Sequence, residues 1–253
     1  MDYYKTPEEF MSACGYTIDG VWYPRVTKIV SIKAKPALYR FYASVGYVNG
    51  QNIAEKSAEE GTKLHEAVEG ILLGKEADID PGILPAVESF RGFLKDNGIE
   101  VVPDHVERRI LHKTHKYSGT TDALACIGGK FGVLDIKTSL SIYRDYNLQT
   151  AAYIEALKDD FPALETRWIL RIDQAEKCTR CNATRRIKGY EKIRANGRYP
   201  CPDGAHDWGE RRGIIEIKEF PDWKSDFEAF LGAKRLWEWE NEEMLESVGY
   251  LPA

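Results

Sequence analysis

Residues 117–153 constrain the fold of this chain more than any other stretch, because they combine two strand signals, a turn signal and a helix signal. Residues 120–127 (TTDALACI) and 130–137 (KFGVLDIK) are apolar-rich runs, and Gly128-Gly129 separates them. A Gly-Gly pair between two such runs predicts a tight β-hairpin. A helix is expected to follow and to include Tyr153.

Three charged side chains of this hairpin can meet. Side chains alternate along a strand, so Asp135 and Lys137 leave on one face, while Leu134 and Ile136 point into the core. Asp122, at the start of the preceding strand, can lie across the hairpin from them. Carboxylate oxygens suit Mg²⁺ or Mn²⁺, and such an ion stabilises charge on a phosphate and acidifies a bound water. The hairpin therefore predicts a divalent-cation site with a base beside it.

An isolated Asp-x-Lys alternation is more often a solvated strand face, so its neighbours decide the interpretation. Several of them occur at regular spacings: Gly61 and His65, four residues apart; the run Gly119-Thr-Thr-Asp122; and Gln149 and Tyr153, four apart on one helix face. In this order and spacing, these elements resemble the RecB-type branch of the PD-(D/E)XK nucleases, which includes lambda-type exonucleases.

The resemblance implies an α/β fold with a restriction-endonuclease-like core, in which helices flank a central mixed β-sheet. It also implies metal-dependent hydrolysis of phosphodiester bonds in DNA. In the family pattern, Asp122 and Asp135 bind one or two Mg²⁺ or Mn²⁺ ions, and His65 and the backbone carbonyl of Ile136 help to hold the metal. Lys137 orients or deprotonates the attacking water and offsets charge in the transition state.

The same resemblance assigns three residues to positioning the substrate. Gln149 and Tyr153 would hold the DNA strand near the scissile phosphate. Glu107 resembles a glutamate that the family carries before the Gly-x-x-Asp run, and it would support the metal or the DNA. Glu69 lies one helical turn after His65, where it either orients the imidazole ring or is a plain surface glutamate.

Four metal-ligand residues follow the hairpin in two close pairs. Cys178 and Cys181, then Cys201 and His206, have the layout of a structural zinc ribbon or knuckle. An alternative is an iron-sulfur cluster held by Cys14 with the other three cysteines, the order found in some RecB-type nucleases of CRISPR adaptation type. The nineteen residues between Cys181 and Cys201 favour zinc.

The segment around these ligands is basic and poor in core-forming side chains. Residues 174–212 contain ten Lys/Arg and five Asp/Glu, so a metal would supply the free energy that folds them. We expect a nuclease core formed by residues 1–173 and 213–253, with residues 174–212 inserted as a zinc-finger-like subdomain. This insertion is either a DNA grip or a solvated flap. Its aromatic residues available for stacking on bases are Tyr190, Tyr199 and Trp208.

Composition limits the partners and the compartment. The net charge of −5 argues against polyanion binding over the whole surface, so DNA contacts would come from local basic patches and bridging ions. Five cysteines, two of them in a C-x-x-C pair, fit a reducing cytoplasm in a bacterial or phage-infected cell. No apolar run approaches the roughly 20 residues of a membrane span, and the N-terminus carries no secretory signal pattern.

The function that the sequence favours is a Mg²⁺- or Mn²⁺-dependent deoxyribonuclease, an exonuclease of DNA repair, recombination or replication, in a phage or bacterial setting. One alternative is a DNA-binding protein that keeps the nuclease fold without cleavage. Another is an adaptor whose finger recruits a recombinase or a single-strand-binding protein. Nothing in the sequence favours a particular oligomeric state.

Local signals predict further elements. Thr6 and Pro7 predict the start of a short helix, Asp19-Gly20 a hairpin, and Thr27 and Pro36 the starts of two helices. The remaining expectations are a long helix over 50–74, a helix over 80–97, a strand over 99–113, paired strands over 163–172 and 213–220, and a helix over 223–250.

Overall fold

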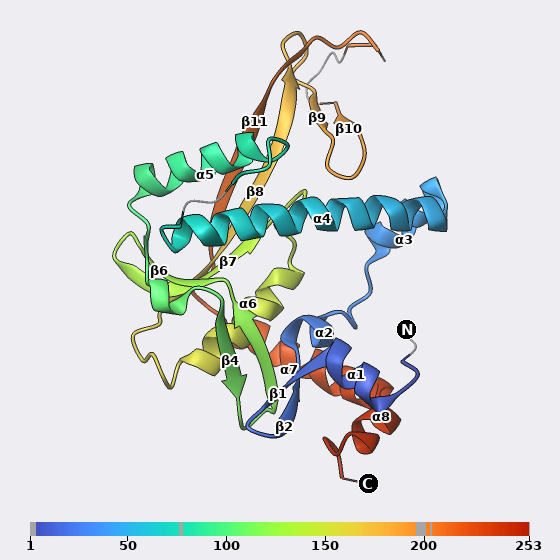
Figure 1. The fold of residues 1–253 in the computed structure, drawn as a ribbon, viewed down its shortest axis with the longest axis vertical. Coiled ribbons are helices and arrows are strands. Elements are labelled where there is room, and N and C mark those ends of the chain that lie inside the picture. Colours follow the sequence, from blue (N-terminus) through green and yellow to red (C-terminus); the bar gives the residue numbers. More distant parts are fainter. Residues whose placement is uncertain (1–3, 76–77, 196–200, 203, 253) are drawn as a thin grey trace.

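The computed structural model describes residues 4–75, 78–195, 201–202 and 204–252. It has the expected α/β architecture, in which helices flank a central mixed sheet (Figure 1). Within these residues, seven strands form that sheet in the order β10-β9-β8-β7-β6-β3, and β11 pairs with β8. The strand bounds are Glu100–Val101 (β3), Ala123–Ile127 (β6), Lys130–Lys137 (β7), Thr166–Cys178 (β8), Thr184–Arg186 (β9), Lys192–Arg194 (β10) and Trp208–Glu219 (β11).

The centre of the sheet is the parallel pair of β7 and β8; the other strand pairs in it are antiparallel. The first nine residues of β8 are all buried, as expected for a strand covered on both faces. On its other side β8 pairs with β11, from Trp168 opposite Glu219 to Cys178 opposite Trp208. This confirms the predicted pairing of the last two strands.

Strands β8 and β11 continue well beyond the helical layers (Figure 1). At about 3.3 Å per residue, the thirteen residues of β8 span roughly 40 Å. The short strand β9 pairs with the outer part of β8, and β10 pairs with β9. Both long strands cross the predicted domain boundaries, at 173/174 and 212/213, without interruption, and the division into core and insertion stays a prediction.

The predicted hairpin is present, but its first strand is shorter than expected. Ile127 pairs with Lys130 across a two-residue loop, and Gly128 and Gly129 both have positive φ (59° and 81°), as a primed turn requires. The run 120–127 is not one strand. Residues up to Thr121 belong to β5 (Tyr117–Thr121), which pairs with β4 (Arg108–His112) in a separate sheet, and the chain bends at Asp122.

Two helices cover one face of the central sheet: α4 (Tyr47–Leu72) and α5 (Leu84–Asn97). Leu64 and Val68 of α4 and Phe90 of α5 pack with Leu134 and other residues of the strands. Helix α5 ends as predicted at Gly98, in the left-handed region (φ 55°). It begins four residues later than predicted, because residues 80–83 form a turn that the Asp80 carboxylate closes on the Gly82 N–H.

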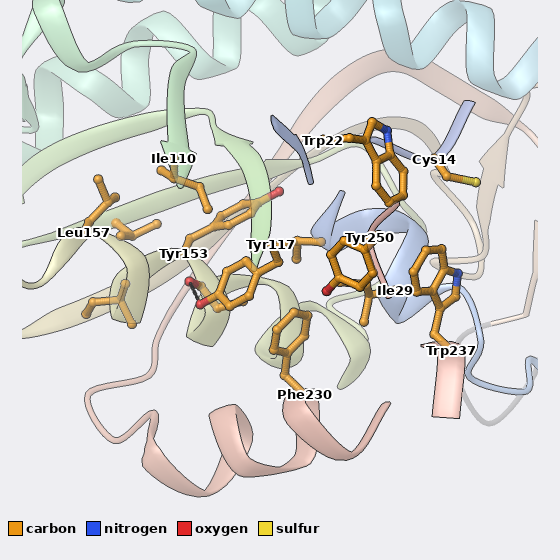
Figure 2. Close-up of a cluster of buried hydrophobic side chains, with 14 of the residues drawn as sticks. Cys14, Trp22, Ile29, Ile110, Tyr117, Tyr153, Leu157, Phe230, Trp237 and Tyr250 are labelled. Carbon is orange, nitrogen blue, oxygen red and sulfur yellow. Dashed lines mark hydrogen bonds between the residues drawn. The ribbon is translucent and has the colours of Figure 1, made fainter. Parts of the chain in front are cut away.

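The other face carries a larger aromatic cluster (Figure 2). Tyr117 and Tyr153 lie at its centre, with Trp22, Phe230 and Trp237 around them. Besides residues of the strands β4 to β7, it takes residues from α1 (Pro7–Cys14), β2 (Val21–Pro24), α2 (Val26–Val30), α6 (Asp145–Leu157), α7 (Lys224–Glu240) and α8 (Glu242–Ser247). The strand β1 (Gly15–Ile18) precedes β2. Among the described residues, no helix has the length and hydrophobicity needed to cross a lipid bilayer.

Most of the local predictions are confirmed. The Thr6 hydroxyl accepts the Glu9 N–H at 3.2 Å, β1 pairs with β2 as a hairpin, and Pro36 begins α3 (Pro36–Val45). Three are wrong in detail. Thr27 lies inside α2, whose N-cap is Arg25; the C-terminal helix is divided at Asn241; and the strand expected over 99–113 is broken by a 3₁₀ turn at Pro103–His105.

Arg167 of β8 is fully buried, and we expect the stability of the fold to depend on its partner Asp226. The guanidinium donates to backbone carbonyls, including Asp222 O at 2.9 Å, to the Thr150 hydroxyl at 3.0 Å, and to the Asp226 carboxylate. Asp226→Ala leaves that buried charge without its anion, so the free energy of unfolding should fall by about 3–5 kcal/mol in urea titrations. Glu228→Ala, on the exposed side of α7, is the control. A loss no larger in Asp226→Ala than in this control would contradict the assignment.

Candidate functional site

The three charged residues predicted from the hairpin do meet at the end of β7. The Lys137 ammonium donates to Asp135 Oδ1 at 2.9 Å and lies 2.7 Å from Oδ2. The Asp122 carboxylate accepts the backbone N–H of Ile136, which lies between the other two residues. Asp122 reaches this position because the chain bends there on its way from β5 to β6.

Burial dominates the titration of this group. It raises the pKa of Asp135 to about 6, a rise that Lys137 opposes and Asp122 increases. Burial also raises the pKa of the Asp122 carboxyl. For Lys137, burial alone would lower the pKa, but the two carboxylates outweigh it and raise the pKa above its usual value. One buried and one half-buried carboxylate beside a single ammonium leave a negative region that a further cation would neutralise.

One atom shows that these residues fit a divalent cation. Asp135 Oδ2 is buried and accepts no hydrogen bond from the described residues, although the Lys137 ammonium lies close to it. Carboxylate oxygens from two neighbouring aspartates are a donor set that Mg²⁺ and Mn²⁺ prefer. The residue types and their closeness therefore match the ion that the sequence predicts.

His65 of α4 approaches the same point from the other face of the sheet. Burial lowers the pKa of its imidazole, and the Lys137 charge lowers it further, so the ring is neutral at pH 7. A hydrogen bond with the backbone of Ile136 raises the pKa of His65. The two predicted metal ligands, His65 and the backbone of Ile136, therefore lie side by side. A neutral imidazole is the form that binds metal ions.

Two glutamates add to the negative charge. Glu107 adopts a left-handed backbone conformation (φ 50°), and its N–H donates to the Asp122 carbonyl at 2.9 Å. Burial, then Asp122, then Glu69 raise the pKa of Glu107 to about 7. Glu69 also raises the pKa of Asp122. Glu69 is half-buried, and its role beside His65 stays a prediction.

Gln149 and Tyr153, which the sequence predicted to position the DNA strand, are bonded to each other, and the positioning role of Gln149 stays a prediction. The Gln149 side-chain amide donates to Asp135 Oδ1 at 3.2 Å and to the Tyr153 hydroxyl at 2.8 Å. Tyr153 is only 2% exposed, because its ring fills the space over Gly119, where a Cβ atom would lie 2.7 Å from it. The hydroxyl therefore holds Gln149, and Gln149 holds Asp135. Direct contact of Tyr153 with a substrate is the part of the prediction that its burial corrects.

A pocket of about 310 Å³ opens beside His65 and Lys137. Tyr146, Arg186 and Lys188 form other parts of its wall. The sequence missed these three residues as site residues, although the run Arg185-Arg186-Ile187-Lys188 after the C-x-x-C pair is a visible basic signal. A larger hollow of about 900 Å³ lies between the N-terminal segment and α8. Its lining includes none of the residues described so far around Asp122, Asp135 and Lys137.

The predicted zinc ligands also come together, at the far end of β8 and β11. One ligand atom from each of Cys178, Cys181, Cys201 and His206 lies within 4.8 Å of the others. Four such atoms are the usual ligand set of a tetrahedral zinc ion, with Zn–S of about 2.3 Å. Cys14 lies instead in the aromatic core beside Trp22 (Figure 2), so it does not complete an iron-sulfur site with these cysteines.

The backbone around Cys178 favours a thiolate. Burial raises the pKa of Cys178, but the N–H groups of Arg180 and Cys181 and the His206 ring outweigh it and lower that pKa to about 6. Asn182 makes the tight turn after the pair in a left-handed conformation (φ 61°). Thiolates are the form of cysteine that binds zinc, so the residues fit this ion.

The predicted stacking residues have other partners. The Trp208 ring lies 4.6 Å from that of His206 and 4.8 Å from the Arg185 guanidinium. Tyr190 packs against Phe41 of α3 at 5.7 Å between ring centroids. Tyr199 lies outside the described residues.

Comparisons with known proteins give a partial match. No family model matches the chain. Mitochondrial genome maintenance exonuclease 1 of Homo sapiens is 33% identical over 112 residues, which is 40% of this chain and 31% of that protein. The match thus spans less than a third of that relative. The crystal structure of SSO0001 aligns over 89% of this chain and 85% of that one, with 16% identity and a TM-score of 0.36.

Proposed function

We propose that this chain is a metal-dependent DNA nuclease, and that it acts as an exonuclease. The observation that carries the proposal is the arrangement at the end of β7, where Asp122, Asp135 and Lys137 share one point beside a pocket. The partial match to a protein named as an exonuclease supports the same activity. The two carboxylates beside a single ammonium support the requirement for a metal.

The proposed roles follow from the chemistry of each side chain. Asp122, Asp135, His65 and the Ile136 carbonyl would hold one or two Mg²⁺ or Mn²⁺ ions, which supply positive charge to the phosphate and lower the pKa of a bound water. Lys137, which its raised pKa keeps protonated, would orient that water and neutralise charge as oxygen attacks phosphorus and the P–O bond breaks. Gln149 would hold the Asp135 carboxylate in position through its hydrogen bond to Oδ1.

Incubation with labelled linear and circular DNA tests this proposal. In Mg²⁺ or Mn²⁺ we expect degradation of linear DNA only, and removal of the divalent ion should stop it. Cutting of circles would indicate an endonuclease. A mobility shift without any product, in the presence of either ion, would contradict nuclease activity and favour the alternative of a non-cleaving DNA-binding protein.

We also propose that Cys178, Cys181, Cys201 and His206 hold a structural Zn²⁺ ion, and that residues 174–212 act as a stabilised extension of the nuclease core. The closeness of the four ligand atoms and the lowered pKa of the Cys178 thiol support zinc at this position.

A further inference from the structure

The loop after β9 is packed tightly onto helix α4. Gly189 has a positive φ of 72°, and a Cβ atom there would lie 2.0 Å from Ser57 Oγ and 2.6 Å from Ile53 O. The Ser57 hydroxyl also donates to the Lys188 carbonyl at 3.4 Å. Only glycine permits this approach, and the contact fixes the preceding residue, Lys188, beside α4.

The Lys188 side chain reaches the pocket of the candidate active site. Its ammonium donates to the Thr138 carbonyl at 2.8 Å, one residue beyond Lys137. It also lies over Gly61 of α4, where a Cβ atom would be 3.3 Å from Nζ. Lys188 therefore shares a wall with His65 and Lys137, although it belongs to the segment that follows the C-x-x-C pair.

Lys188 is a buried cation with no carboxylate in direct contact among the described residues, and the charges of Glu60 and Asp173 act on it only from farther away. It is 7% exposed, and no carboxylate in the described part of the chain forms an ion pair with it. Arg186, in the same pocket, has the Asp173 carboxylate at 2.8 Å. An ammonium has three N–H donors, and one hydrogen bond to a carbonyl leaves two of them for a ligand. Burial lowers the pKa of Lys188 to about 8, which is the cost of keeping this charge away from water.

We propose that Lys188 binds a backbone phosphate of the DNA strand that enters this pocket, next to the phosphate that is cleaved. The assignment rests on the proposed nuclease function. A phosphate supplies the missing anion, and a contact to it is independent of base sequence. The pocket volume of about 310 Å³ is at the lower end of the range for ligand pockets and suits one phosphate with its sugar.

Salt dependence of DNA binding tests the assignment. The parent protein carries Asp135→Asn, so that bound DNA stays intact, and anisotropy of labelled oligonucleotides is followed from about 50 to 200 mM salt. Lys188→Gln keeps a donor for the Thr138 carbonyl but removes the charge. We expect it to weaken binding about tenfold and to lower the slope of log K against log salt by about 0.7 for single strands or 0.9 for duplex.

Two matched variants complete the experiment. Lys188→Arg keeps the charge and should restore the parent slope. Lys130→Gln removes the same charge at the opposite end of β7, where Lys130 pairs with Glu219, and should leave the slope unchanged. In the otherwise unaltered protein, Lys188→Gln should raise KM about tenfold while kcat changes less than about threefold.

The outcomes are distinct. A slope in Lys188→Gln equal to that of a parent that binds DNA overturns the phosphate contact alone. An unaltered protein that does not cleave DNA in Mg²⁺ or Mn²⁺ overturns the nuclease function and this contact with it, whereas cleavage with an unchanged KM in Lys188→Gln overturns the contact alone. Partial unfolding of a variant lowers the active concentration but not the slope, so it does not imitate the expected result.

Discussion

The Asp135→Asn variant is expected to lose DNA cleavage by a factor of at least about 10³ in kcat, while its free energy of unfolding stays within about 1 kcal/mol of the parent value. Asn keeps the shape of the side chain and an oxygen that accepts from Gln149. It removes the charge that a divalent ion requires. Burial already disfavours the charged form of Asp135, and Asp122 remains as an anion near Lys137, so the fold loses little when the Asp135 charge is absent.

Thermal unfolding separates loss of metal binding from loss of structure. The parent should gain about 2.7 kcal/mol of stability when Mg²⁺ is present at a hundred times its dissociation constant, and Asp135→Asn should gain much less. Lys137→Met is the matched control, because it removes the neighbouring charge but keeps both carboxylates. It should also lose cleavage, by about 10²–10⁴-fold, yet retain stabilisation by Mg²⁺. Mg²⁺-dependent cleavage by Asp135→Asn at the parent rate would refute the assignment.

The second large effect is expected from removal of Cys178, a proposed zinc ligand. Metal analysis of the purified protein should give close to one zinc per chain, and Cys178→Ser should hold far less. Apparent zinc binding free energies of about 10–16 kcal/mol in small finger peptides show how much of the local fold depends on such an ion. We expect limited proteolysis to cut Cys178→Ser within 174–212 and to leave the remaining chain protected.

The expected protection of the core follows from the separation of the clusters. The cysteine cluster packs only with Ala183 and Trp208 among the described residues, whereas the two clusters of the central sheet contain none of its ligands. Cys126→Ser makes the same atomic change in β6 and should retain zinc and the parent proteolysis pattern. Iron with a brown colour in the purified protein, or full zinc content in Cys178→Ser, would contradict this assignment.

Local chemistry made part of this structure predictable. Gly128-Gly129 between apolar runs specified the hairpin, and the alternation along its second strand placed Asp135 and Lys137 on one face. The cysteine and histidine spacings identified the second cluster for a similar reason, since both pairs are close in sequence. The Gly-Gly turn, the strand alternation and the ligand spacings each depend on a few neighbouring residues and on local backbone geometry, and in this fold tertiary contacts leave them unchanged.

Features that depend on distant packing were not predictable. Nothing local indicates that the chain changes sheets at Asp122, because the deciding contact is with Ile136 on another strand. The burial of Tyr153 depends on Gly119, and the position of Lys188 depends on the close approach of Gly189 to α4. In each case the contacting residue is distant in sequence, so hydrophobic periodicity and composition do not predict the contact.

The position of the cysteine cluster at the outer end of β8 and β11 also bears on the order in which the chain folds. These strands are paired from Trp168 and Glu219 outward to Cys178 and Trp208, with about thirty residues between the outer ends. Closing that loop costs entropy before any ladder hydrogen bond forms. An ion bound by both Cys178 and His206 would close this loop before the strands pair. Pairing of β8 with β11 would then begin at Cys178 and Trp208 and proceed toward Trp168 and Glu219.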